Sequence, residues 1–391
     1  MTYRAIYAYA WDIVERGVPK VIDEVKGLGL NTITVAGSYH AGKFLRPRGT
    51  GGKVYFPEDG TIYFRTDPSR YGAIKPVANH ILGEHDVFAE LTQAGGIAVN
   101  AWMVLLHNTR LGEAYPDATV VNAFGDRYVY SLCPSHPAAR ELAVALCRDV
   151  TERYPIIGIS IEAPGFAPYA HGFHHEFALV KPNRWLDAQL GLCFCDHCRA
   201  GARKAGIDAE GLRSRVGAAI ESYLAADIDL PDDMAEAFWL ADTRSDGELA
   251  EFLAWRCTVV TSLVTEIREA VRKDAAVAVI PSVARPTGGA WYEGTDLKAL
   301  AWAAGIIEAC FYEPSASRVL ADAWDVKRRI GSDGAIRGIM RAAHPDLNSA
   351  GEVAAAVAGL HKAGIDDIAF YNYGFYRPRS FDWIRAALAG T

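Results

Sequence analysis

The chain has 391 residues, of which 50% are hydrophobic and 22% are charged, and its formal net charge is −7. This composition fits a folded protein with a large core, either one large barrel or two ordinary domains. The net negative charge, without a cluster of Lys and Arg residues, argues against nucleic acid or an anionic membrane as the main partner.

The first residues, MTYRAIYAYAWD, lack the basic start and long apolar run of a signal peptide. No apolar run reaches the roughly 18 residues that a membrane span needs. We therefore expect a cytoplasmic protein. In that compartment we expect the seven cysteines to be reduced. Cysteines that cluster in the sequence are then expected to bind a metal or form a redox site rather than disulfide bonds.

Short apolar runs alternate with amphipathic stretches along the chain. The runs predict strands over residues 4–11, 32–37, 97–106, 156–161, 276–283, 306–312, 335–341 and 367–373. Apolar residues at spacings of three and four predict helices over residues 18–29, 86–96, 137–154, 248–273, 296–305, 317–331, 349–364 and 380–390. Eight such alternations predict a (β/α)8 TIM barrel in a single domain over residues 1–391, with an open doubly wound sheet as the alternative.

Two connections are too long for simple loops between a strand and a helix. They cover residues 38–85, after the second strand, and about 163–245, after the fourth. Both follow the carboxyl end of a strand, which is the catalytic face of a barrel. We expect these insertions to form walls of a pocket.

Acidic residues at the strand ends are the candidate catalytic groups. Glu162 directly follows the apolar run IIGISI, where a charge costs desolvation unless it faces a polar pocket. Glu313 follows the sixth strand, whereas Glu308, near the start of that strand, is expected to serve stability. Two carboxyl groups across a barrel mouth suit cleavage of a glycosidic bond, so Glu162 and Glu313 are the predicted pair.

Aromatic and hydrogen-bonding residues near the other strand ends suit a sugar, which has apolar C–H faces and hydroxyl edges. Asp12 is predicted at the end of the first strand, and Asp346 is the reserve partner for Glu162. The predicted substrate contacts are Asp12, His40, Trp102, His107, Arg341, His344, Asp346, Tyr371 and Asn372.

Three cysteines fall within the stretch GLCFCDHC. Cys193, Cys195 and Cys198 have the spacing C-x-C-x2-C, which gives three soft ligands for a tetrahedral ion that needs a fourth. Cys195 and Cys198 also have C-x-x-C spacing, but they lack the small βαβ context of a thioredoxin-type redox site.

The succession CPSHPAARE from Cys133, a strand that ends in Glu162, and CFCDHCRAGARKAGID from Cys193 resembles the family 42 β-galactosidases and related glycoside-hydrolase-like barrels. The resemblance implies that Cys133, Cys193, Cys195 and Cys198 hold a structural Zn²⁺ and that Glu162 is the acid/base.

The chain also departs from that family. The family's acid/base follows an Asn, whereas Glu162 follows Ile161, and its nucleophilic Glu ends the seventh strand, where this chain has His344 and Asp346. Acids on strands four and six instead resemble the α-galactosidase-type barrels, in which the carboxylate of strand four is the nucleophile. The role of Glu162 within the pair is therefore left open.

The sequence thus predicts a glycoside hydrolase that is exo-acting and retaining and cleaves a small glycoside or oligosaccharide. An isomerase or lyase that acts on a sugar or sugar acid is one alternative, and a catalytically inactive carbohydrate-binding barrel is another. No nucleic-acid or membrane partner is expected, and a homo-oligomer is left open.

Overall fold

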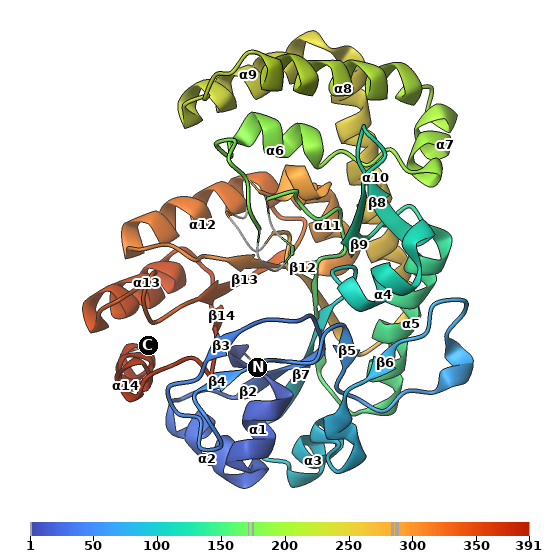
Figure 1. The fold of residues 1–391 in the computed structure, drawn as a ribbon. Helices are drawn as coiled ribbons and strands as arrows, with labels where there is room; N and C mark the ends of the chain where they lie inside the picture. The colour runs from blue at the N-terminus through green and yellow to red at the C-terminus, as the bar shows by residue number, and fades with distance from the viewer. Residues whose placement is uncertain (1, 171, 174–175, 283–284, 286–288, 391) are drawn as a thin grey trace.

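Eight parallel strands close into a barrel (Figure 1). The structure is a computed structural model, which describes residues 2–170, 172–173, 176–282, 285 and 289–390. In barrel order the strands are β1 (Arg4–Ala8), β2 (Thr32–Tyr39), β7 (Ala98–Val104), β10 (Gly158–Glu162), β11 (Ala276–Val279), β12 (Gly305–Cys310), β13 (Ala335–Met340) and β14 (Asp367–Phe370). Pairing of β1 with both β2 and β14 closes the ring, so the predicted (β/α)8 fold is confirmed.

Amphipathic helices follow the strands and bury their apolar faces against the barrel. They are α2 (Val18–Gly27), α3 (Val87–Ala94), α5 (Pro137–Arg153), α10 (Gly247–Ala270), α11 (Leu297–Ala304), α12 (Ala316–Ile330), α13 (Ala350–Lys362) and α14 (Pro378–Ala389). All eight overlap the predicted helices, because the spacing of the apolar residues and the capping residues point to the same segments. In the described part of the chain, no helix is both long and apolar enough to cross a membrane.

Three insertions, rather than two, extend from the carboxyl ends of strands. After β2 come the short strands β3 (Phe44–Leu45), β4 (Val54–Tyr55), β5 (Thr61–Ile62) and β6 (Val77–Ala78). After β7 come α4 (Thr109–Ala114) and a hairpin of β8 (Thr119–Val121) and β9 (Arg127–Leu132). After β10 come α6 (Arg184–Leu190), α7 (Asp196–Lys204), α8 (Ala209–Ala225) and α9 (Asp232–Ser245). The insertion after β7 was not predicted.

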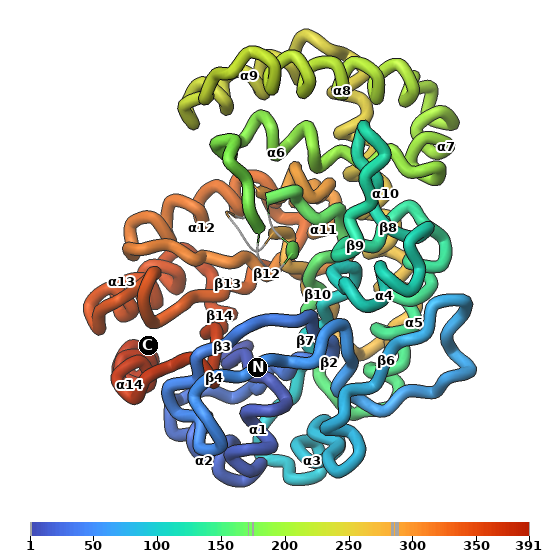
Figure 2. Tube along the Cα trace, viewed as in Figure 1, coloured from blue at the N-terminus to red at the C-terminus, as the bar shows by residue number. Residues whose placement is uncertain are grey.

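The insertion after β10 forms a helical lobe with an apolar core of its own. Trp185, Phe194, Leu212 and Phe252 belong to this core, which is separate from the core of the barrel. Figure 2 shows α8 and α9 crossing the top of the molecule, with α6 between them and the barrel. The chain therefore has one barrel and one lobe built from a single insertion and the start of α10.

The first strand is shorter than the sequence predicts. Strand β1 ends at Ala8, and Trp11 and Asp12 lie in the helix α1 (Ala10–Arg16). A short apolar run can form either a buried strand or a buried helix, and periodicity alone does not distinguish them. The sequence therefore predicts that the first strand continues through Trp11. Asp12 therefore lies in the first turn of a helix, where the helix dipole favours a negative charge.

Candidate functional site

Glu162 is the last residue of β10, at the catalytic face of the barrel. Its carboxylate accepts a hydrogen bond of 2.6 Å from the indole Nε1–H of Trp102, which lies on the neighbouring strand β7. Burial raises the pKa of Glu162 to about 7, although the Trp102 hydrogen bond and the charge of Arg341 both act to lower it. A carboxyl group with a pKa near neutrality can both give and take a proton at physiological pH.

Trp102 belongs to a cluster of aromatic rings beside Glu162. The ring centroid of Trp102 lies 5.0 Å from that of Tyr39 and 5.7 Å from that of Tyr371. The Tyr9 hydroxyl lies 2.7 Å from the Tyr371 hydroxyl and donates to the Tyr39 hydroxyl at 2.9 Å. The predicted contacts Trp102 and Tyr371 are thus brought together beside Glu162 in one aromatic cluster.

Arg341, which is paired with Asp346, packs against this cluster. The Arg341 guanidinium carbon lies 3.6 Å from the ring centroid of Tyr312 and 5.6 Å from that of Tyr371. Its Nη1 lies 3.3 Å from the Asp346 carboxylate. Burial raises the pKa of Asp346, against the lowering effect of Arg341. The positive charge of Arg341 acts on Glu162 and favours its ionised form.

Two predicted histidines stack on each other. The His40 and His107 rings, which follow β2 and β7, have centroids 4.1 Å apart. His107 Nε2 lies 3.1 Å from the carbonyl oxygen of Gly172, and His40 Nδ1 lies 2.7 Å from that of Ala41. The insertions after β2, β7 and β10 therefore meet at this histidine pair.

The structure places the other predicted contacts outside the aromatic cluster. Asp12 is buried in α1, where its carboxylate lies 3.3 Å from Arg46. Asn372 is fully buried, and its side-chain oxygen accepts a hydrogen bond of 2.9 Å from the backbone N–H of Gly374. This bond stabilises the turn that follows β14. His344 is exposed and close enough to Asp346 to act on its charge.

Glu313 lies in an ion-pair network after β12. Its carboxylate contacts Arg285 at 2.7 Å and also binds Arg318, the latter on α12. These two guanidinium groups outweigh the effect of burial and hold the pKa of Glu313 below its usual range. The strand β11 separates β10 from β12 in the barrel. A catalytic pairing of Glu162 with Glu313 stays a prediction.

A carboxyl group that sequence reasoning missed, that of Glu293, lies near enough to Glu162 for the charge of Glu162 to act on it. Glu293 ends the short 3-10 helix η4 (Ala290–Glu293), which follows β11. Burial, with a smaller contribution from the charge of Glu162, raises the pKa of Glu293 to about 8, against the lowering effect of a hydrogen bond with Ser282. The strand-end rule did not find Glu293 because a long loop separates it from β11. Gly294, directly after it, adopts a left-handed conformation with φ +74°, and a glycine at this position was a local signal of a tight turn.

The four predicted cysteines come together. The Sγ atoms of Cys133, Cys193, Cys195 and Cys198 all lie within 4.8 Å of one another, and all four residues are buried. The Sγ of Cys133 lies 3.5 Å from that of Cys198, 3.6 Å from that of Cys195 and 3.9 Å from that of Cys193. Backbone N–H groups of Val121 and Ser135 point at the sulfurs of Cys193 and Cys133. The cluster joins the hairpin after β7, the start of α5 and the helical lobe.

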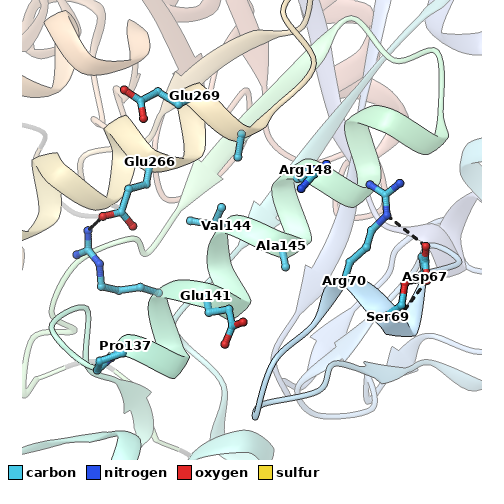
Figure 3. Close-up of a pocket in the computed structure, with 12 residues that line it drawn as sticks. Asp67, Ser69, Arg70, Pro137, Glu141, Val144, Ala145, Arg148, Glu266 and Glu269 are labelled. Atoms are coloured by element: carbon cyan, nitrogen blue, oxygen red, sulfur yellow. Dashed lines mark hydrogen bonds and ion pairs between the residues drawn. The ribbon is translucent and has the colours of Figure 1, made fainter.

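A shallow groove of about 1120 Å³ lies away from this face, between α5, α10 and residues 67–70 (Figure 3). Two ion pairs lie within it: Arg140 contacts Glu266 at 2.6 Å, and Arg70 contacts Asp67 at 3.4 Å. It contains none of the predicted site residues. The candidate site is therefore the mouth of the barrel around Glu162.

No protein-family model matches the chain, and no curated protein matches it in sequence at a significant level. The predicted kinship with family 42 β-galactosidases is thus not confirmed. Among solved structures, the chain resembles the PgaB (BpsB) glycoside hydrolase domain from Bordetella bronchiseptica, with a TM-score of 0.60 and 14% identity over 99% of each chain.

It also resembles α-L-fucosidase isoenzyme 2 from Paenibacillus thiaminolyticus, with a TM-score of 0.53 and 13% identity. That match covers 100% of this chain but only 49% of the fucosidase. At these identities the likeness is one of fold, and it agrees with the (β/α)8 barrel described above.

Proposed function

We propose that the protein is a glycoside hydrolase that uses Glu162 as one carboxyl group of its catalytic pair. The observation that carries the proposal is a strand-end glutamate with a pKa of about 7 inside an aromatic cluster at the catalytic face. Aromatic faces bind the C–H faces of sugars, and a carboxyl group that titrates near neutrality can transfer a proton to or from a glycosidic oxygen. The two solved structures described above are named as a glycoside hydrolase domain and an α-L-fucosidase, and these names agree with the proposed function.

The finer parts of the proposal concern the mode of cleavage. Insertions after β2, β7 and β10 meet at His40 and His107, and we propose that they form a pocket for the end of a small glycoside or oligosaccharide, with exo-action. We also propose retention of the anomeric configuration, which requires two carboxyl groups about 5 Å apart. Proton NMR of the first anomer released distinguishes retention from inversion.

We further propose that the four cysteines hold one structural Zn²⁺. A tetrahedral ion with Zn–S bonds of about 2.3 Å places its sulfur ligands about 3.8 Å apart, close to the spacing of the Cys133 sulfur from the other three. Four buried thiolates leave no coordination position for substrate. The ion would fasten the helical lobe to the barrel. We also propose a cytoplasmic location, where thiols are kept reduced and remain available as metal ligands.

A reducing-end assay on a panel of nitrophenyl glycosides and oligosaccharides tests the function, because hydrolysis creates one new reducing end for each bond cleaved. We expect release from at least one member of the panel and a loss of that release in Glu162→Gln. Conversion of a free sugar without a new reducing end would favour an isomerase or lyase. Thermal stabilisation by a sugar without any turnover would favour a carbohydrate-binding barrel.

A further inference from the structure

The loop that carries Glu293 starts beside Glu162. Strands β10 and β11 are neighbours in the barrel, with Ile161 opposite Val279. The backbone N–H of Ile280 donates to the carbonyl oxygen of Ile161 at 2.8 Å, so the two strands stay paired up to the residue before Glu162. Ser282, which is buried two residues later, hydrogen-bonds the Glu293 side chain. The carboxyl group of Glu293 is thereby held at the end of β11, next to the end of β10.

The backbone around Glu293 is fixed against the loop that follows Glu162. The N–H of Phe166 donates to the carbonyl oxygen of Glu293 at 2.9 Å. A Cβ atom on Gly165 would collide with that same carbonyl oxygen, so the close approach needs a glycine at position 165. The start of the loop after β10 is therefore joined to the far end of the loop after β11, and the two glutamates have little freedom to separate.

The surroundings of the two carboxyl groups differ. Glu162 accepts the short hydrogen bond from Trp102 and feels the positive charge of Arg341, and both favour its ionised form. Glu293 has the Ser282 hydroxyl as its hydrogen-bond partner and feels the negative charge of Glu162. When only one of the two carboxyl groups is protonated, the proton therefore resides mainly on Glu293, and Glu162 is ionised.

We propose that Glu293 is the proton donor of the catalytic pair and that Glu162 is its carboxylate partner, the nucleophile. This assignment rests on the proposed glycosidase function and makes it more specific. As the bond between the anomeric carbon and the leaving oxygen breaks, the Glu293 proton moves to that oxygen, and a Glu162 oxygen bonds to the anomeric carbon. Water then attacks the same carbon, Glu293 takes the water proton, and the Glu162 carboxylate is released. The sum is hydrolysis with retention of configuration.

Leaving-group dependence tests the two roles. The probes are 2,4-dinitrophenyl glycosides, whose leaving group needs no proton, and the matching methyl glycosides, whose leaving group does. We expect Glu293→Gln to lose about 10²-fold to 10⁴-fold in kcat/KM, which reports the steps up to departure of the leaving group, on methyl glycosides and less than about tenfold in kcat/KM on dinitrophenyl glycosides. Glu162→Gln should lose activity on both, and Glu269→Gln, at an exposed position of α10, should lose activity on neither. Equal losses on the two probes in Glu293→Gln would overturn the assignment.

A titration without substrate separates this proposal from the proposed function. Carbon NMR of protein labelled at the glutamate side-chain carboxyl carbon reports the ionisation of each group. We expect the Glu293 signal to titrate at lower pH in Glu162→Gln than in the wild type, because a negative neighbour has been removed. Titration of Glu293 that is the same in both proteins would overturn the pairing. If the wild type cleaves no glycoside in the panel, the proposed function fails, and the titration still decides whether the two acids form a pair.

Discussion

The guanidinium of Arg256 lies over the ring of Phe166, with 4.4 Å between the guanidinium carbon and the ring centroid. The same guanidinium donates to the carbonyl oxygen of Gly191 at 3.2 Å and to that of Tyr292 at 3.0 Å. Gly191 precedes the cysteine cluster, Phe166 follows Glu162, and Tyr292 precedes Glu293. One buried side chain thus links the cysteine cluster to both loops that carry the carboxyl groups.

Replacing Arg256 should therefore affect activity without removing the metal. In Arg256→Met the apolar packing on Phe166 is largely kept, but the carbonyl oxygens of Gly191 and Tyr292 lose a charged donor. We expect bound zinc to be retained and kcat to fall about tenfold or more, because small displacements of catalytic groups are costly. Arg268→Met on the same helix is the control, since among the described residues Arg268 donates to the backbone of residues 273 and 275. Loss of zinc in Arg256→Met would contradict this role.

Removing one cysteine of the cluster should release the metal. We expect the purified wild type to hold about one zinc ion per chain and Cys133→Ser to hold almost none, with a lower melting temperature. Cys147→Ser is the matched control, because Cys147 is a buried cysteine of α5 outside the cluster. Elemental analysis together with thermal unfolding measures both effects. A wild type without zinc, or a Cys133→Ser protein that keeps it, would refute the site.

Replacing Trp102 should change the pH dependence of the reaction. In Trp102→Phe the Glu162 carboxylate loses the donor that stabilises its charge, so the pKa of Glu162 rises above about 7. The acid limb of the kcat/KM profile, which reports ionisation of Glu162, should move to higher pH by about one pH unit. Trp324→Phe, at an exposed position of α12, should leave the profile unchanged. An unshifted acid limb in Trp102→Phe would show that this hydrogen bond does not control Glu162.

Glu162 should also lower the stability of the protein at high pH. The pKa of Glu162 is about 7 in the folded protein, whereas its ordinary value, taken for the unfolded chain, is 4.5. Between pH 4.5 and about pH 7, Glu162 is therefore protonated in the folded state and ionised in the unfolded state. Stability therefore falls as pH rises through this window. Glu162→Gln cannot ionise, and we expect its free energy of unfolding to exceed that of the wild type by about 1–3 kcal/mol at pH 8. Urea unfolding at pH 8 and pH 4.5 measures this, with little difference expected at the lower pH.

The barrel could be predicted because its signal is local. Each barrel strand is buried on both faces and reads as a short apolar run, and each helix carries its own spacing and capping residues. Glu162 could be predicted for the same reason, since it is the last residue of β10. The error at Trp11 and Asp12 arose because YAYAW continues the apolar run of β1 into α1.

Glu293 and Arg256 could not be predicted because their roles depend on tertiary contacts. Glu293 lies well beyond β11 and reaches Glu162 through the contact of its loop with Gly165 and Phe166. Arg256 is one residue in the regular helical pattern of α10, which gives no sign of its function. Its role in linking the loops follows from its contact with the Phe166 ring. Glu313 followed the strand-end rule, but the arginines that bind its carboxylate come from a loop and a helix, which the rule does not consider.

The most direct test of the account is kcat/KM for the wild type and Glu162→Gln on the glycoside that the wild type cleaves best. Gln keeps the shape of the side chain and can still contact Trp102, but it can neither transfer a proton nor form the covalent intermediate. We expect kcat/KM to fall at least about 10³-fold, with an unchanged fold by circular dichroism. A Glu162→Gln protein with kcat/KM within about threefold of the wild type would contradict the central claim.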